Sequence, residues 1–260
     1  MKLTKDAIRR EADETALVGG ELLVFDELDS TNTYLKTHWE LPDGTAVIAD
    51  CQSAGRGRLS RTFLSPAGKG LYLSVLFRTP LPEDALLSLT ALAGVAAARA
   101  IEDVSGLAVG IKWPNDLHLG GKKCAGILAE RCVMGETSAA VVGIGINVSQ
   151  TAEDFPGDLA ETAVSLCAAG AEVDRAALAA ALLRELDAVY ARLRAGEQSA
   201  YLAEYRARCE NVGREVRLLA ADGTERRALV TGIDARYGLE VEIDGEREVI
   251  RTGEISLRPL

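Results

Sequence analysis

Residues 52–76 read QSAGRGRLSRTFLSPAGKGLYLSVL and place a loop rich in glycine and arginine between two apolar runs that predict strands. Five residues give the loop this character: Gly55, Arg56, Gly57, Arg58 and Arg61. Arginine carries permanently charged, forked donors that suit carboxylate and phosphate, and glycine lets backbone N–H groups approach an anion. This loop, residues 55–61, is called the arginine loop below, and it is predicted to hold an anion and to close over it. For an isolated GRGR, a solvated basic loop that binds nothing is the alternative interpretation.

The sequence on both sides of this loop predicts strands. Short apolar runs that read as strands lie at 22–25 and 45–51 before the loop and at 71–77 after it. Between the first two, Ser30 or Thr31 would cap a helix that runs to about Trp39. Ser30, Thr31 and Asn32 can be read as capping residues alone or as part of a binding site.

The motif KWPNDL at 112–117 forms a polar corner at the end of a predicted strand. Pro114 stops that strand, so that Lys112, Asn115 and Asp116 stand together at its end. A lysine beside amide and carboxylate oxygens suits phosphate together with Mg²⁺, which prefers oxygen ligands and few protein contacts. The alternative is a polar turn in which the Asn and Asp side chains bond the backbone.

Two further strands carry residues that suggest a ligand. After a predicted hairpin turn at 120–121, the next strand contains Lys123 and Gly126, and a buried strand at 139–148 carries two glycines and Asn147 near its end. Glycine inside a strand marks the close approach of a ligand or of another backbone, so the glycines predict a flat slot with a polar tip. The glycine spacing is not GxGxxG, which argues against a Rossmann fold. Lys123 alone would be read as a solubilising surface lysine.

The rest of the chain predicts support for this site and a second domain. Helices are predicted at 81–104, 174–194 and 200–209. After Asn211 the pattern changes to short strands separated by turns, for example at 237–238 and 244–245. We therefore expect two domains, residues 1–210 and a small β-barrel at 211–260.

The composition excludes several classes of protein. A net charge of -10 over 260 residues argues against a general nucleic-acid binder. No apolar run approaches membrane-spanning length, and the amino-terminal stretch lacks the apolar core of a signal peptide. The five cysteines form no CxxC and are odd in number, which indicates reduced thiols and a cytoplasmic protein.

Taken in order, the motifs resemble those of the biotin protein ligases, also called biotin–[acetyl-CoA-carboxylase] ligases. The match runs from about Leu22 to the carboxyl terminus. The segments that carry it are STN (30–32), QSAGRGR (52–58), LYLS (71–74), KWPNDL (112–117), KKCAGIL (122–128), GIGINV (143–148) and GEISLR (253–258). The resemblance implies an α+β fold: a mixed sheet flanked by helices, related to class II aminoacyl-tRNA synthetases, followed by an SH3-like β-barrel.

The resemblance also implies a reaction in two steps. The biotin carboxylate attacks the α-phosphate of ATP and gives biotinyl-5′-adenylate and pyrophosphate, with Mg²⁺ and cations lowering the charge repulsion. A lysine of a biotin carboxyl carrier protein, such as a subunit of acetyl-CoA carboxylase, then attacks the mixed anhydride and releases AMP. The partners implied are this carrier, biotin and ATP, with no DNA and no membrane, and a homodimer is possible.

By the same resemblance, each motif residue receives a role. Lys123, Asp116 and Arg58 would be catalytic, with Lys123 as the main cation, and Asn115 together with Asp116 would hold Mg²⁺. The residues expected to bind biotin are Ser30, Thr31, Asn32, Gln52, Arg56, Gly57, Arg58, Lys123 and Gly126. Those expected to bind the nucleotide are Arg58, Phe63, Lys112, Asn115 and Asn147.

The sequence departs from the family pattern in two places. Phe63 stands where some members carry a tryptophan that stacks on adenine. Residues 1–20 predict one short helix, too little for a helix-turn-helix module, so we expect the monofunctional form without a DNA-binding domain. Two rival interpretations are a lipoate–protein ligase, which shares the fold and the adenylation chemistry, and a non-catalytic sensor of biotin or its adenylate.

Overall fold

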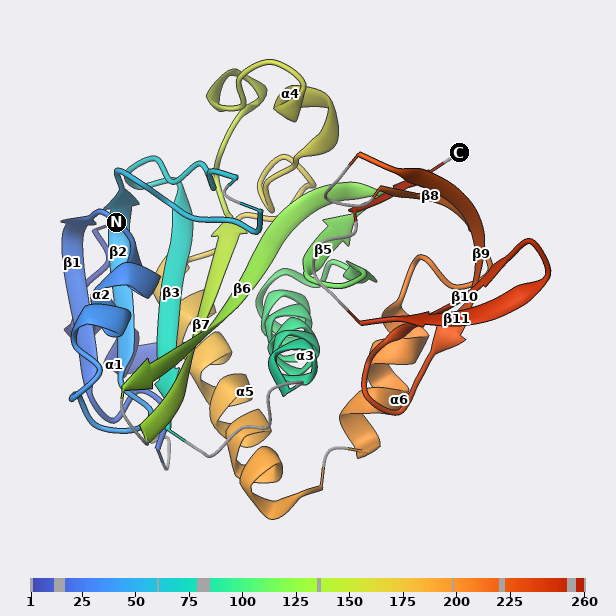
Figure 1. Cartoon of the computed structure of the whole chain (residues 1–260). Coiled ribbons are helices and arrows are strands. Elements are labelled where there is room, and N and C mark those ends of the chain that lie inside the picture. Colours follow the sequence, from blue (N-terminus) through green and yellow to red (C-terminus); the bar gives the residue numbers. More distant parts are fainter. Residues whose placement is uncertain are drawn as a thin grey trace.

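The computed structural model describes residues 2–11, 17–59, 61–78, 85–134, 137–197, 199–219, 223–251 and 256–259. Two β-sheets organise these residues (Figure 1). One has seven strands in the order β1-β2-β3-β7-β6-β5-β4, and the other has five in the order β11-β10-β9-β8-β12. The predicted first turn of the long helix, residues 81–84, and residues 253–255 of the terminal motif lie outside the described part of the chain.

The seven-stranded sheet is mixed, because β1 and β2 run parallel whereas the other neighbouring strands are antiparallel. Its strands are β1 (Leu22–Leu28), β2 (Ala46–Gln52), β3 (Gly70–Phe77), β4 (Gly110–Lys112), β5 (Asp116–Leu119), β6 (Lys122–Met134) and β7 (Thr137–Asn147). β3 is buried along its whole length, which explains why its sequence is apolar at nearly every position, without alternation. The strands predicted around the arginine loop are therefore confirmed.

Helices α2 and α5 begin at residues whose side chains satisfy free backbone N–H groups. Ser30 caps α2, as its side chain accepts from Thr33 N, and Asp174 Oδ1 accepts from Ala176 N at the start of α5. α5 ends at Gly196, whose φ of 71° is the left-handed conformation typical of helix ends. The helices are α1 (Lys5–Glu11), α2 (Thr31–Thr37), α3 (Ala85–Ser105), the 3-10 turn η1 (Ala152–Asp154), α4 (Leu159–Thr162), α5 (Arg175–Ala195) and α6 (Ser199–Arg208).

The main core lies between one face of this sheet and helices α3 and α5 (Figure 1). Many buried residues of α3 are alanines, which let the helix lie close to β6 and β7. Phe77 of β3 packs on Tyr190 of α5, with ring centroids 4.5 Å apart. The opposite face carries α2 over a smaller cluster that includes Leu35, Val47 and Leu76. Helices α3 and α5 thus support the sheet on one face, and the ends of β6 and β7 stay accessible to the arginine loop.

The KWPNDL corner differs from the prediction in one respect. Pro114 does end a strand, but Asp116 already begins the next one, and β4 and β5 form a tight antiparallel hairpin with Lys112 opposite Asp116. The two strands have only 3 and 4 residues, too short for a periodic sequence pattern. The hairpin places the lysine and the carboxylate side by side across a strand pair.

The second sheet follows α6 and is antiparallel throughout. β10 alternates buried and half-buried residues, as expected for a sheet with one face covered. Its strands are β8 (Glu215–Leu219), β9 (Glu225–Ile233), β10 (Leu239–Ile243), β11 (Glu246–Ile250) and β12 (Ser256–Pro259). The predicted fold class, a mixed sheet flanked by helices plus a small carboxyl-terminal β-domain, is confirmed. The division into residues 1–210 and 211–260 stays a prediction.

None of the helices among the described residues combines the length and the apolar character that crossing a bilayer requires.

Candidate functional site

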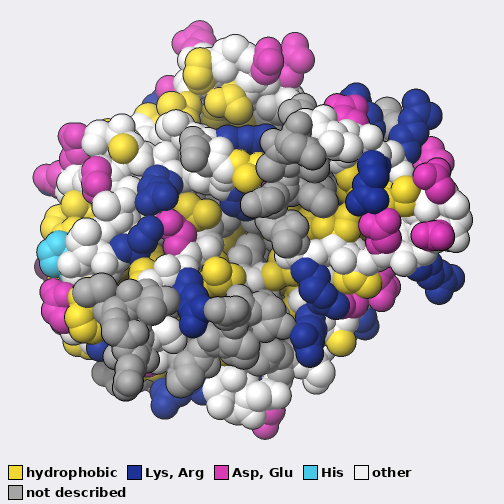
Figure 2. All heavy atoms as spheres, viewed as in Figure 1, with side chains coloured by type: hydrophobic (Ala, Val, Ile, Leu, Met, Phe, Trp, Pro, Cys, Tyr) yellow, Lys and Arg dark blue, Asp and Glu magenta, His cyan; other side chains and the backbone are white. Residues whose placement is uncertain are grey.

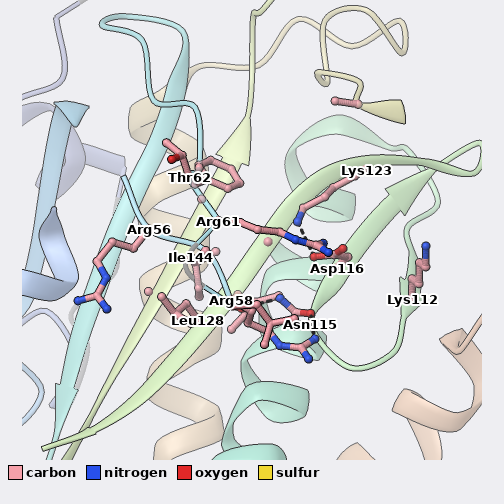
Figure 3. A pocket seen from close by; sticks show the side chains of 18 of the residues that line it. Arg56, Arg58, Arg61, Thr62, Lys112, Asn115, Asp116, Lys123, Leu128 and Ile144 are labelled. Carbon is pink, nitrogen blue, oxygen red and sulfur yellow. Dashed lines mark hydrogen bonds and ion pairs between the residues drawn. The ribbon is translucent and has the colours of Figure 1, made fainter. Parts of the chain in front are cut away.

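A cavity of about 800 Å³ lies among the arginine loop, the β4–β5 corner and the ends of β6 and β7 (Figure 3). Figure 3 shows Arg56 on one side of it, Lys112 on the other, and Lys123 and Asp116 between them. The predicted site residues that line this cavity are Ser30, Thr31, Asn32, Gln52, Arg56, Gly57, Arg58, Phe63, Lys112, Asn115, Asp116, Lys123 and Gly126. Motifs spread over almost a hundred residues of sequence therefore meet in one place.

Glycines on adjacent strands form the floor of the cavity. Gly126 of β6 pairs with Gly145 of β7. A Cβ atom on Gly145 would lie 2.5 Å from the Phe63 ring, and one on Gly143 would lie 2.2 Å from Asn32 Oδ1. Both separations are shorter than a Cβ atom tolerates, so the absence of a side chain is what allows Phe63 and Asn32 to lie on these strands. The flat slot predicted from the glycine pattern has this origin.

One end of the cavity is formed by uncharged hydrogen-bonding groups, most of them buried. Thr31 N and Thr31 Oγ1 lie 2.9 and 3.1 Å from Gln52 Oε1, and Gln52 Nε2 donates to Ser65 Oγ at 2.9 Å. Ser74 Oγ lies 2.7 Å from Thr31 Oγ1 and 2.6 Å from Asn32 Oδ1. This network fixes the amide and hydroxyl groups in one orientation. It suits a neutral ligand group that both donates and accepts hydrogen bonds.

Glu130 of β6 stands behind this polar end and was not predicted. It accepts from Asn32 Nδ2 at 2.9 Å and from Lys36 Nζ at 2.8 Å, and Arg56 of the loop lies 3.3 Å away. Burial would raise the pKa of the Glu130 carboxyl, but the hydrogen bonds from Lys36 and Asn32 hold that pKa below its ordinary value. An ionised Glu130 therefore orients Asn32 and anchors the arginine loop.

Two contacts lie in the middle of the cavity, one an ion pair and the other a hydrogen bond. Lys123 Nζ lies 2.6 Å from Asp116 Oδ1, and Arg58 donates to Asn115 Oδ1 at 2.7 Å. Asn115 is itself fixed, because its Nδ2 donates to the carbonyl of Ile127 at 3.0 Å. Burial lowers the pKa of the Arg58 guanidinium, and the nearby charge of Asp116 opposes this effect. Lys123 and Arg58 are thus each held by a partner from the β4–β5 corner.

The lining of the cavity is more basic than the chain as a whole, which has a net charge of -10. Figure 2 shows Lys and Arg side chains around the middle of this face and many acidic side chains near its outline. The basic lining residues are Arg56, Arg58, Arg61, Lys112, Lys123 and Arg217, and the acidic ones are Asp116, Asp158 and Glu161. Such a concentration of positive charge in a concave site favours an anionic ligand.

Asn147 is the one predicted site residue that is absent from the cavity lining. It is buried at the end of β7, where its Nδ2 donates to the carbonyl of Val164 and its Oδ1 accepts from Gln150 Nε2. Val164 N in turn donates to the carbonyl of Lys123 at 2.9 Å. Asn147 thus supports the segment that lies against Lys123.

The predicted magnesium ligands occupy adjacent positions at the corner. Asp116 offers one carboxylate next to Lys123, and the side-chain oxygen of Asn115 already accepts from Arg58. Among the described residues there is no group of three or more His, Cys, Asp or Glu side chains that would hold a metal ion by itself. This set fits Mg²⁺ only in the mode in which phosphate oxygens and water supply most of the ligands.

Sequence reasoning missed several residues that line or support the cavity. Ser74 and Glu130 lie inside strands, where a polar residue that faces a site cannot be told from one that faces solvent. His118 and Arg217 also line the cavity, and Arg217 comes from β8 of the second sheet. The alternation in β5 places His118 on the same side as Asp116 and could have indicated it. Nothing in the sequence indicated Arg217.

Comparisons with known proteins agree with this geometry. Residues 24–147 match the model of the biotin/lipoate A/B protein ligase family. The chain is 42% identical over 182 residues to the bifunctional ligase/repressor BirA of Bacillus subtilis, a match over 67% of this chain and only 55% of that protein. It is 35% identical over 219 residues to the biotin–[acetyl-CoA-carboxylase] ligase of Mycobacterium tuberculosis, a match over 82% of this chain and 79% of that one.

The fold is also similar to solved structures. The structure of biotin protein ligase from Aquifex aeolicus in complex with biotin and ATP superposes with a TM-score of 0.80 at 30% sequence identity. The similarity covers 93% of this chain and all of the Aquifex chain (100%).

The contacts of Glu130 predict how stability depends on pH. Glu130→Gln should lower the free energy of unfolding at pH 7 by roughly 1–3 kcal/mol, because it weakens hydrogen bonds to a charged group. The pKa of Glu130 is lower in the folded state, so its contribution is present above the ordinary value of 4.5 and is lost as the pH falls through the folded pKa. Urea denaturation of both proteins between pH 3 and 7 should show the difference shrinking toward acid. A difference that stays constant would contradict the prediction.

Proposed function

This chain belongs to the biotin protein ligase family, and we propose that it attaches biotin to a lysine of a biotin carboxyl carrier protein through biotinyl-5′-adenylate. One observation carries the proposal: a single cavity contains both a neutral polar end and the Lys123–Asp116 and Arg58–Asn115 pairs. Biotin has a neutral ureido ring at one end and a carboxylate at the other, which matches this polarity. The relative from M. tuberculosis and the Aquifex complex with biotin and ATP support the same assignment.

In the proposed first step, the ureido ring of biotin binds at the polar end. Thr31, Asn32 and Gln52 are fixed by their mutual hydrogen bonds and by Ser74, so they present donors and acceptors without reorganising. The biotin carboxylate then points toward Lys123 and Arg58. These cations offset the repulsion between the carboxylate and the α-phosphate of ATP.

The nucleotide is proposed to enter from the side of the KWPNDL corner. Phe63 lies on the glycine slot and offers a ring face to the adenine, while Lys112 and Arg58 face the phosphates. Asp116 would hold Mg²⁺ together with phosphate oxygens, and the bound ion would lower the charge repulsion of the first step. Asn115 would support the ion less directly, since its oxygen already accepts from Arg58.

In the proposed second step, the carrier lysine enters the corner after pyrophosphate has left. Asp116 is placed to orient the incoming ammonium and to accept its proton. The neutral amine then attacks the anhydride carbonyl, forms the amide bond and expels AMP. The arginine loop covers the adenylate meanwhile and excludes water. We place the reaction in the cytoplasm, where ATP and the carboxylase are found.

The proposal is tested by incubating the purified chain with a biotin carboxyl carrier domain, radiolabelled biotin and Mg²⁺, with and without ATP. We expect label on the carrier only when ATP is present. Label from lipoate in place of biotin would favour the rival lipoate ligase. Tight biotin binding with no release of pyrophosphate would instead favour a sensor.

The ammonium of Lys123 is expected to act in the first step. Lys123→Ala removes a cation from the point where carboxylate meets phosphate and should slow adenylate formation by about a hundredfold, as loss of an oxyanion contact does. The rate of pyrophosphate release with biotin and ATP measures this, and circular dichroism checks that the variant is folded. Lys122→Ala, one residue earlier and exposed, is the matched control and should stay near wild type. An equal effect of both substitutions would remove Lys123 from this role.

Arg58 connects the arginine loop to the corner through Asn115, so Arg58→Gly should loosen the cover more than it slows adenylation. The variant should form biotinyl-adenylate and release it, which labels lysines of a bystander protein such as albumin. Biotin blotting detects this labelling, with Arg58→Lys as a control that keeps the cation. A variant that neither releases adenylate nor labels the bystander would show that the loop does not act as a cover.

A further inference from the structure

The KWPNDL corner faces the cavity on one side and the second sheet on the other. β4 is the strand at one end of the large sheet. Its outer edge is covered by residues Cys209–Asn211, which lead from α6 into β8. Ile111 and Cys209 form a parallel bridge, and Glu210 N donates to the carbonyl of Ile111 at 2.9 Å. The connection between the two sheets therefore pairs with the strand that carries the corner.

Trp113 is the point at which this connection holds the corner. Its backbone N–H donates to Asn211 Oδ1 at 2.8 Å, and its indole N–H donates to the carbonyl of Tyr237 at 2.9 Å. Trp113 is 2% exposed and Asn211 is 7% exposed, so water does not readily replace either partner. Tyr205 packs edge-to-face on Tyr237, with ring centroids 5.5 Å apart, and so supports the residue whose carbonyl accepts from the indole.

A second contact from the same connection reaches the cavity lining. Glu210 Oε2 lies 3.0 Å from His118 Nδ1, and His118 lines the cavity on the strand that begins at Asp116. Glu210 passes over Gly110, where a Cβ atom would lie 2.2 Å from its Oε1. The missing side chain of Gly110 thus makes room for this contact.

We propose that Asn211 is a positioning residue for the nucleotide: it acts through Trp113 on the adjacent Lys112, Asn115 and Asp116. Asn211 does not line the cavity, so it has no direct route to a ligand there. Lys112 directly precedes Trp113, and the two predicted magnesium ligands, Asn115 and Asp116, follow within three positions, so the position of the Trp113 backbone bears on all three. The polar end of the cavity is built from α2, β2 and β3 and has no part in this connection. The inference rests on the proposed function, in which this corner binds ATP.

The polar end and the KWPNDL corner are separate parts of the cavity, so the effect of Asn211 on biotin binding and on ATP binding can be measured independently. Asn211→Leu keeps the size of the side chain but leaves Trp113 N–H without its acceptor, whereas Asn211→Asp keeps an acceptor oxygen. We expect Asn211→Leu to weaken ATP binding about tenfold or more, since small displacements of positioning groups have effects of this size. Biotin binding should change less than about twofold. Asn211→Asp should restore most of the ATP affinity.

Calorimetric titration of each folded protein with biotin alone, and with ATP and Mg²⁺ alone, gives both affinities without catalysis. Tyr190→Phe is the matched control, because it also removes hydrogen bonds of a buried side chain, here those from the Tyr190 hydroxyl to Asp43 on the other end of the core. If Asn211→Leu does not fold, Asn211→Ser, whose hydroxyl is too short to reach Trp113 N, takes its place with the same expectation. Equal loss of both affinities, or unchanged ATP affinity, overturns the proposal.

Pyrophosphate exchange by the wild-type protein separates this inference from the proposed function. Absence of exchange in a wild-type protein that binds ATP would contradict the ligase proposal, while the titrations would still decide the role of Asn211. A wild-type protein that does not bind ATP at all would overturn both.

Discussion

Asn115 connects three parts of the chain, and the geometry of the cavity depends on these contacts. Its backbone carbonyl accepts from Ile127 N and its side-chain amide donates to the Ile127 carbonyl, so the corner is fixed to β6 on two sides. Its side-chain oxygen accepts from Arg58 and so holds the arginine loop in place. A residue that looks like a turn former in the sequence therefore holds the cationic loop, the corner and the glycine floor in one arrangement, next to the Lys123–Asp116 ion pair.

Much of the fold could be predicted because burial leaves a local record in the sequence. β3 is apolar at nearly every position because both of its faces are buried, and α2 and α5 begin at Ser30 and Asp174 because a helix needs such caps. The β4–β5 hairpin was missed since strands of 3 and 4 residues are held by pairing with their neighbours and not by their own pattern. The contacts between the two sheets left no local signal for the same reason.

The candidate site was predictable to the extent that its residues sit in recognisable motifs. Thr31, Gln52 and Lys123 come from distant motifs and line one cavity, as expected. Asn147 belongs to a motif but lies beneath the site, because a motif also records residues that support the backbone. Glu130 and Asn211 were invisible, since each acts through a contact with a residue about a hundred positions away in the chain.

The covered edge of β4 also bears on how the protein can be divided. Residues Cys209–Asn211 satisfy backbone groups of an outer strand that would otherwise be open to pairing with another chain. A fragment cut before Cys209 would expose this edge together with the indole of Trp113, and such edges promote self-association. The connection between the two sheets therefore protects this edge from pairing with another chain, and truncations need to spare it.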